Sequence, residues 1–233
     1  MDTLFTYIRR FNSLLLFAGL ISLTLLVLWV IVSSTEWADR DVVTTATASG
    51  TQEELRFRLE DFKDIPGTHT QMLKLTASKA NAGIDYSSYK SDTRNILFLT
   101  GDEKAGRWLF DSQDNIIHSA AQLTTASDEE DSGKNKTTQA LYFVYGDQDT
   151  TGDGEITQGD RSKIGLSKAN GEGFTTVLSD IDHVYAVSLI GNRSISILYR
   201  IGKSLRQARY SVETLARELD REVVAIPGVE YRD

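Results

Sequence analysis

Residues 55–60 read LRFRLE, and this stretch decides the fold of the chain that follows it. Leu55, Phe57 and Leu59 alternate with charged residues, and this period of two is typical of a β-strand with one face against a core. Short apolar runs separated by turn residues continue from there toward the end of the chain. The sequence therefore predicts a mainly antiparallel β domain over residues 55–233.

The apolar runs predict further strands at 72–75, 96–99, 108–110, 116–117, 141–145, 163–167, 174–178, 184–190, 195–201 and 207–212. Gly101–Gly106 and Gly191-Asn192 predict hairpin turns. The charged stretch at 127–137, SDEEDSGKNKT, predicts a solvated loop. Short strands at near-regular spacing suit either a sandwich or a stack of propeller-type blades, and the pattern leaves both open.

Near the end of the chain the apolar spacing changes. Val212, Leu215, Leu219 and Val223 share one face of a helix, and Pro227 follows them. The sequence therefore predicts one late C-terminal helix beside the strands.

Residues 11–35 contain no charged side chain, and those from Leu14 to Val32 are almost all apolar. These nineteen residues would extend about 28 Å as a helix, close to the ~30 Å thickness of a bilayer core. The segment predicts a single transmembrane helix. A cleaved signal peptide is the alternative, with a site at Ala46-Thr47-Ala48, but the apolar run is longer than such peptides use.

The charges beside this segment give its orientation. Arg9 and Arg10 precede it, and Glu36, Asp39 and Asp41 follow it. The positive-inside rule therefore predicts residues 1–10 in the cytoplasm, residues 36–54 as a linker, and residues 55–233 outside. A chain without cysteine fits a bacterial periplasmic domain. We expect the bacterial inner membrane as its location and the lipid bilayer as one partner.

The overall charge excludes one class of partner. The formal net charge is −8, whereas nucleic-acid binding needs clustered Lys and Arg, so we expect no nucleic-acid partner. The absence of cysteine excludes disulfides and thiolate-held metal sites.

Residues 149–160 read DTTGDGEITQGD, the most informative stretch for chemistry. With Asp149 as position 1, Thr151 is at 3, Asp153 at 5, Glu155 at 7 and Asp160 at 12, with glycine at 6 and isoleucine at 8. This is the spacing of a calcium loop, in which oxygen ligands converge from alternate positions while the backbone turns at the glycine. We expect Ca²⁺ as the cofactor, held by these five residues, with Glu155 using its backbone carbonyl.

The twelve residues resemble the dockerin and EF-hand type of loop, DxNxDGxIxxxD. Thr151 departs from the usual Asp or Asn, and Asp160 departs from the usual Glu, which implies a weaker site of the extracellular kind. Because residues 141–145 and 163–167 read as strands, we expect the loop to be inserted in a β-hairpin. That arrangement looks like the Asp-rich insertions in TolB-type β-propeller blades. A plain polar turn is the alternative interpretation.

Other chemical motifs are incomplete. Gly202-Lys203-Ser204 lacks the upstream glycine of a phosphate-binding loop, and Gly171-Glu172-Gly173 lacks the third glycine of a dinucleotide fingerprint. His69, His118 and His183 have no metal-ligand spacing. From this we expect no organic cofactor, no catalytic residues and no enzymatic activity.

These observations favour a membrane-anchored accessory or structural subunit, whose partner is an integral membrane protein or a further copy of the chain. One alternative is a calcium-responsive sensor or regulator of an envelope process that acts through a membrane partner. A second is an envelope hydrolase whose site the spacing does not reveal.

Overall fold

The computed structural model describes residues 22, 42–48, 51–79, 91–125 and 136–227. The chain divides into two compact units, Met1–Asp41 and Val42–Asp233. Apart from Ser22, the predicted membrane segment at 11–35 lies outside the described residues. Within the described residues, no helix has the length and apolar character that crossing a membrane requires.

The second unit is built from antiparallel strands, which confirms the mainly β prediction. The strands are β1 (Val42–Ala48), β2 (Thr51–Asp64), β3 (Thr70–Lys79), β4 (Asp92–Thr100), β5 (Ala105–Trp108), β6 (Ile116–Thr124), β7 (Thr138–Gly146), β8 (Ser162–Lys168), β9 (Thr175–Ile181), β10 (His183–Ile190), β11 (Ser194–Ile201), β12 (Ser204–Ser211) and β13 (Arg217–Ala225).

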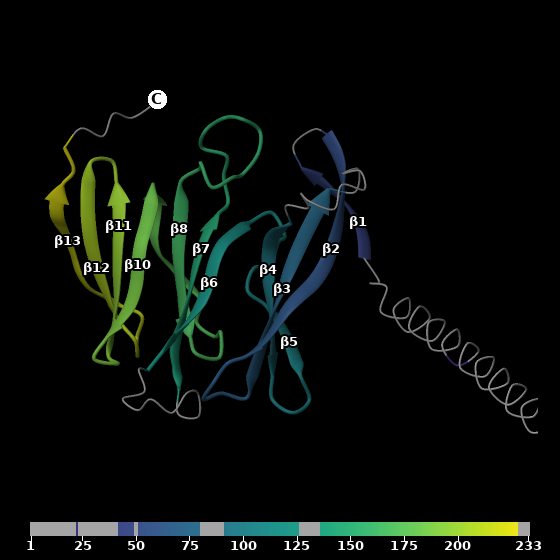
Figure 1. Cartoon of the computed structure of the whole chain (residues 1–233), viewed down its shortest axis with the longest axis horizontal. Helices are drawn as coiled ribbons and strands as arrows, with labels where there is room; N and C mark the ends of the chain where they lie inside the picture. Colours follow the sequence, from purple (N-terminus) through teal and green to yellow (C-terminus); the bar gives the residue numbers. More distant parts are fainter. Residues whose placement is uncertain (1–21, 23–41, 49–50, 80–90, 126–135, 228–233) are drawn as a thin grey trace, which may run out of the picture. The chain divides into compact units, whose positions relative to one another are not determined.

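These strands form two sheets in which the pairing strands follow one another along the chain (Figure 1). The larger sheet has the order β1-β2-β3-β4-β6-β7-β8-β9, with β5 paired to β4, and the smaller has the order β10-β11-β12-β13. Between β4 and β6 the ladder is a single pair, Thr93 with Ile117. The larger sheet therefore consists of two separate meanders, β1–β5 and β6–β9, joined at one point.

The buried side chain of Asn95 marks the place where the two meanders part. Its amide nitrogen donates to the carbonyl oxygen of Phe110 (2.8 Å), and its Oδ1 accepts from the amides of Ile96 (2.8 Å) and Phe110 (3.0 Å). Just after β5, the side chain of Asn95 thereby replaces the hydrogen bonds that a neighbouring strand would make. The amides and the carbonyl that it contacts would otherwise be buried without a hydrogen-bond partner.

Two hydrophobic clusters lie on opposite faces of the β6–β9 meander. In β7, Ala140 belongs to one cluster, whereas Leu141, Phe143 and Tyr145 belong to the other. The first cluster packs β6–β9 against β10–β13 through residues such as Ile197, and the second packs it against β3 and β4. Because alternate side chains of a strand point to opposite faces, β7 serves both cores and the meanders stack in three layers.

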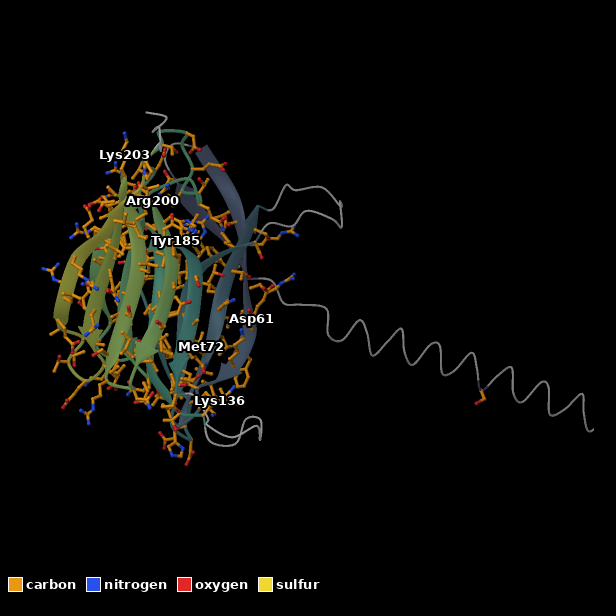
Figure 2. All side chains as sticks on the ribbon, turned by 60° about the vertical axis from the view of Figure 1, so that its left-hand side comes forward. Asp61, Met72, Lys136, Tyr185, Arg200 and Lys203 are labelled. Carbon is orange, nitrogen blue, oxygen red and sulfur yellow. The ribbon has the colours of Figure 1, made fainter. Side chains whose placement is uncertain are left out.

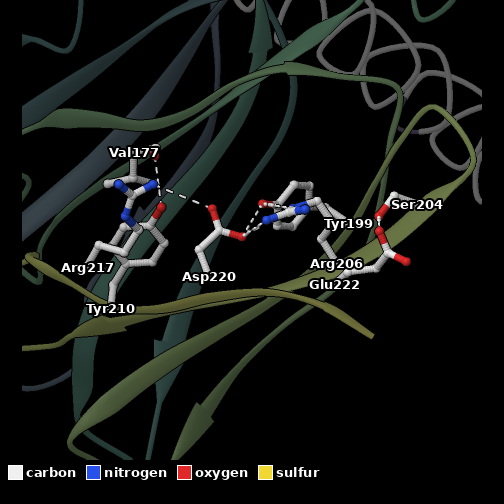
Figure 3. A network of polar contacts seen from close by, with 8 residues as sticks. All are labelled: Val177, Tyr199, Ser204, Arg206, Tyr210, Arg217, Asp220 and Glu222. Carbon is white, nitrogen blue, oxygen red and sulfur yellow. Dashed lines mark hydrogen bonds and ion pairs between the residues drawn. The ribbon is translucent and has the colours of Figure 1, made fainter. Parts of the chain in front are cut away.

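The predicted late helix is wrong, because residues 217–225 form the edge strand β13. A turn after β12 separates the apolar residues that share helical spacing, and Leu215 there has φ 56° and lies buried. Cross-strand contacts then favour the strand over the helix. The hydroxyl of Tyr199 and the guanidinium of Arg206 both donate to Asp220 Oδ1, at 3.0 and 2.9 Å (Figure 3).

The predicted linker at 36–54 does not hold from residue 42 onward. β1 pairs along its length with β2, from Val42 opposite Phe57 to Ala48 opposite Thr51. β-Branched Val and Thr, which fill residues 42–47 apart from one alanine, favour strands once a partner strand is present. In β2, the chain bulges at Asp61, where φ is 55° and the carboxylate accepts from Lys74 at 2.8 Å (Figure 2).

Candidate functional site

The Asp-rich loop connects β7 to β8, which pair antiparallel from Ala140 opposite Lys168 to Tyr145 opposite Lys163. The expectation of a loop inserted in a hairpin is therefore confirmed. An ion pair between Lys163 and Asp147 joins the two strands at the base of the loop, and this hydrogen bond is the main cause that raises the pKa of Lys163.

Asp149 organises the first half of the loop. Its Oδ1 accepts from the amide of Gly152 (2.6 Å) and the hydroxyl of Thr151 (3.2 Å), and its Oδ2 accepts from the amide of Gly154 (2.7 Å). Both glycines have positive φ, 78° and 89°, which lets the backbone curl around the carboxylate. The amide of Gly154 is the main cause that lowers the pKa of Asp149.

Asp160 closes the loop from its other end. Its Oδ1 accepts from the amides of Thr150 (2.6 Å) and Thr151 (2.9 Å), and its Oδ2 accepts from the amide of Thr157 (2.7 Å). Only 3% of Asp160 is exposed. Burial acts to raise the pKa of this carboxyl, but the amides of Thr157, Thr151 and Thr150 outweigh it and lower the pKa to about 2. Asp160 is therefore ionised and binds the two ends of the loop together.

The remaining predicted ligands lie on the exposed side. Asp153 Oδ1 accepts from the amide of Glu155 at 2.9 Å, and both residues are exposed. The structure thus brings Asp149 close to Thr151 and Asp153 close to Glu155, while Asp160 faces the loop amides. In the part of the chain that the structure describes, no three His, Asp or Glu side chains converge as a metal centre. The hard-oxygen chemistry fits calcium, but the described arrangement does not bring the five residues together.

Ile156 connects the loop to the end of β7. A Cβ placed on Gly146 would lie 3.0 Å from Ile156 Cγ2 and 3.3 Å from His118 Nε2, so both side chains press against this glycine. Ile156 is partly buried. Ile156 therefore joins the loop to the end of β7.

A cavity of about 270 Å³ adjoins the loop and separates β6 and β7 from β10. His118, Tyr142, Gln158, Asp182 and His183 contribute to its lining. Two of the three histidines, His118 and His183, thus line one cavity, and no spacing in the sequence could have shown it, because they belong to different sheets.

Asp182 lies at the edge of this cavity and contacts two other segments of the chain. Its Oδ2 accepts from the amide of Gly202 at 2.6 Å, and its Oδ1 lies 4.0 Å from Nε of Arg161, the residue that follows the loop. Only 13% of the Asp182 side chain is exposed. The loop is therefore in contact with the connection between the two sheets.

Comparisons with known proteins show no family for this chain. No family model matches the chain, and no curated protein matches it. Among solved structures, one match is a luciferin-regenerating enzyme, at 12% identity and a TM-score of 0.36. The likeness covers 79% of this chain, and the chain spans 65% of the length of that enzyme.

The expectation of no enzymatic activity is not kept, because one of the solved structures that match is an enzyme, although this likeness does not show that the chain is one. A sequence without a recognisable catalytic motif is therefore no ground for excluding activity here. A likeness at this TM-score assigns no reaction, no substrate and no residue role to the chain.

Proposed function

We propose that this chain is a membrane-anchored, calcium-binding protein whose β domain lies outside the cytoplasm and serves as an accessory or structural subunit of a membrane protein complex. The observation that carries the proposal is the loop between β7 and β8. The carboxylate of Asp149 accepts hydrogen bonds from the amides of Gly152 and Gly154 there. Glycine occupies the turn position of the loop, and carboxylates occupy alternate positions.

Asp149, Thr151, Asp153 and Glu155 would supply oxygen ligands, and Asp160 would close the set. Calcium takes six to eight oxygen atoms in flexible geometry, so a short loop of mixed carboxylate, hydroxyl and carbonyl donors suits it. A carboxylate oxygen has two lone pairs and can accept an amide and contact an ion together. A bound cation would also reduce the mutual repulsion of four carboxylates within twelve residues.

The location of the domain supports the choice of calcium. A loop without the usual Asp or Asn at position 3 and Glu at position 12 fits a weak site, with a Kd on the order of 10⁻⁴–10⁻³ M. Such a site is filled only where calcium is abundant, outside the cytoplasm. The uncharged segment at 11–35, with arginines before it and acidic residues after it, supports the same side of a bacterial inner membrane.

The finer fold assignment that we propose is a stack of propeller-type blades rather than a two-layer sandwich. Strands β2–β5 of the first meander, like the meanders β6–β9 and β10–β13, form a set of four antiparallel strands. The two hydrophobic clusters lie between successive meanders. A sandwich would have one core between two sheets, so two cores support the stack.

Thermal unfolding of the full-length chain in mild detergent tests the calcium site. With a Kd near 10⁻⁴ M, about 1 mM CaCl₂ would stabilise the folded state by about 1.4 kcal/mol relative to EDTA. For a protein of this size that corresponds to a rise in melting temperature of about 3–6 °C. Asp153→Ala should abolish the rise, and Asp111→Ala, in an exposed turn, should preserve it. A wild-type melting temperature that is the same in calcium and EDTA would show that the site assignment is wrong.

The accessory role has its own test. The full-length chain, purified from its native membrane in mild detergent, should bring with it a stoichiometric integral membrane protein. Chain recovered free of any such protein counts against this role and leaves the calcium measurement unaffected.

A calcium-responsive sensor is the second candidate. The contact of Arg161 with Asp182 favours it, because this pair connects the end of the loop to the second sheet. In that case the imidazole NMR signals of His118 and His183, which line the adjoining cavity, should shift on calcium addition. Unchanged signals at saturating calcium would argue against it.

A further inference from the structure

The cavity beside the Asp-rich loop is lined by side chains that the proposed calcium site does not use. Its volume is about 270 Å³, just below the roughly 300–1,000 Å³ of pockets that hold drug-sized ligands, so it suits a smaller molecule. Strands β6, β7 and β10 contribute to its lining, together with the loop through Gln158. Among the residues that the structure describes, no three His, Asp or Glu side chains converge to hold a metal ion. The cavity therefore suits a small organic molecule better than a bare metal ion.

A β-bulge in β10 directs consecutive residues of this edge strand toward the cavity. Val184 and Ala186 pair with consecutive residues of β11, so Tyr185 between them is an extra residue in the ladder. In a regular strand, alternate side chains face opposite sides of the sheet. Here the whole stretch 183–187 contributes to the lining. Bulges at sheet edges commonly re-aim a side chain toward a binding site, and this one brings Tyr185 to the cavity.

Two tyrosine rings line the cavity from its two sides. Tyr185 of β10 is held by an edge-to-face contact with the ring of His183, with 4.7 Å between the centroids and 70° between the planes. Tyr185 is nevertheless 49% exposed, so a ligand can reach its ring (Figure 2). Tyr142 of β7 contributes a second phenol ring. Because the face of such a ring is electron-rich, it attracts a cation that lies over it.

The charge around the cavity is negative. Asp182 supplies a carboxylate of which 13% is exposed, and no Lys or Arg is among the described residues that line the cavity. Arg161 lies 4.0 Å from this carboxylate, beyond hydrogen-bond distance, and is 56% exposed. A carboxylate accepts several donors, so Asp182 can contact a ligand while it accepts from the amide of Gly202.

The adjoining loop strengthens this potential. Residues 149–160 carry four carboxylates and no cationic side chain. Like charges repel, so an anionic ligand would be disfavoured in the cavity and a cationic one favoured. Val144, Val184 and Val187 add apolar contacts to the lining, which favour a ligand that carries methyl or methylene groups beside its charge.

We propose that this cavity binds a small alkylated ammonium ion, with the Asp182 carboxylate as its counter-charge and the rings of Tyr185 and Tyr142 against its alkyl groups. An inorganic cation would lose its hydration shell there without gaining enough oxygen ligands. The site is separate from the calcium loop and requires neither calcium nor the membrane segment. Its failure is therefore distinguishable from the failure of the proposed function.

NMR of the histidine imidazoles in the full-length chain tests this binding. The measurement is made in EDTA, at constant ionic strength, in a maltoside detergent whose headgroup carries no charge. Choline chloride is the probe, and dimethylbutanol, in which a carbon atom replaces the charged nitrogen, is its uncharged control. Choline should shift the signals of His118 and His183 saturably, with a Kd on the order of 10⁻³ M, because so small a ligand has few atoms with which to bind. The signal of His69, which lies outside the lining, should not move.

Substitutions separate the ring from the charge. Tyr185→Leu removes the aromatic face from a half-exposed residue and should weaken choline binding about fivefold. Tyr185→Phe keeps the ring and should bind choline within about twofold of wild type. Asp182→Asn keeps an oxygen for the amide of Gly202 but loses the charge, and should weaken binding about tenfold or more. All three variants should retain the wild-type circular dichroism.

Four results would overturn the proposal. The first is the absence of any saturable shift of His118 and His183 at about 10 mM choline. The second is dimethylbutanol that binds as tightly as choline, which would make the cavity a site for neutral molecules. The third is a folded Tyr185→Leu protein that binds choline as wild type does. The fourth is a choline response that Asp153→Ala abolishes and Asp182→Asn leaves unchanged, which would place the cation on the loop.

Discussion

Removal of the Asp160 carboxylate should destabilise the domain even when no calcium is present. Three backbone amides donate to it, at 2.6, 2.9 and 2.7 Å. Because the donating residues are themselves partly or fully exposed, water can replace each lost partner, so we take about 1 kcal/mol for each bond. Asp160→Ala should therefore cost about 3 kcal/mol, or about 6–12 °C in melting temperature.

Asp160→Asn removes the negative charge of the side chain but keeps nearly the same shape. Its amide oxygen can keep the two amides that now bond to Oδ1, but its NH₂ group then faces the amide of Thr157, which also donates. We expect a cost of about 1–2 kcal/mol. Asp153→Ala removes a single bond from an exposed side chain and should cost less than about 1 kcal/mol in EDTA.

The assay is thermal and urea unfolding of all three variants in EDTA, so that no cation contributes. The order of destabilisation should be Asp160→Ala, then Asp160→Asn, then Asp153→Ala. An Asp160→Ala protein that melts within about 1 °C of wild type would refute the conclusion that this carboxylate holds the loop.

The same carboxylate gives a pH dependence of known sign. The pKa of Asp160 is lowered from 3.8 to about 2 in the folded chain. A group whose folded pKa is depressed stabilises the fold above its unfolded pKa and loses that contribution as pH falls through the folded value. The difference in unfolding free energy between wild type and Asp160→Asn should therefore shrink as pH falls from about 4 to about 2. A constant difference over this range would contradict the assignment.

Three further changes test the packing. Gly165→Ala should cost about 1–3 kcal/mol, because its Cβ would collide with the ring of Phe174 and force that ring to move. Asn95→Ala should cost about 2–5 kcal/mol, because it leaves buried backbone groups unpaired where β4 and β5 separate. Tyr210 donates to the carbonyl of Val177, and burial raises its pKa to about 12. Tyrosine in an unfolded chain ionises near pH 10. The stability that Tyr210 contributes should therefore be lost as the pH rises from about 10 to about 12.

Each of these has a control and a contrary result. Gly106→Ala, whose Cβ meets nothing closer than 3.6 Å, should be tolerated; equal melting temperatures for the two alanine variants would contradict the packing argument. If calorimetry shows that Asn95→Ala leaves the free energy of unfolding unchanged, water must bond to the backbone groups that Asn95 contacts. In an ultraviolet titration, the tyrosine transition at the most alkaline pH should be absent from Tyr210→Phe. If that transition persists, it belongs to another tyrosine.

Part of this fold follows directly from the sequence. The hairpin around the loop was predictable because residues 141–145 are apolar and β-prone, and residues 149–160 consist of turn-forming residues. Gly191 and Asn192 both have positive φ in the turn between β10 and β11, which the amide of Arg193 closes by donating to the carbonyl of Ile190, and glycine and asparagine adopt positive φ more readily than other residues. Local chemistry decides these features, so they can be read from a few neighbouring residues.

Other features depend on pairing at a distance. Residues 217–225 carry an apolar spacing that suits a helix, but pairing with β12 and the contacts of Asp220 with Tyr199 and Arg206 favour the strand β13. Residues 42–48 are a strand because β2 is beside them. In the candidate site, the sequence indicated the acidic residues, but it did not show that Asp160 would turn to the loop amides.

Because the loop follows β7, its conformation should affect the packing of both hydrophobic clusters. The loop begins directly after Gly146, the last residue of this strand, and the strand contributes side chains to both hydrophobic clusters. Whatever keeps the loop closed, whether the Asp160 carboxylate alone or a cation beside it, restrains a strand to which both cores attach. Opening of the loop should therefore loosen the domain as a single cooperative unit, and hydrogen exchange should rise on both sides of β7 together.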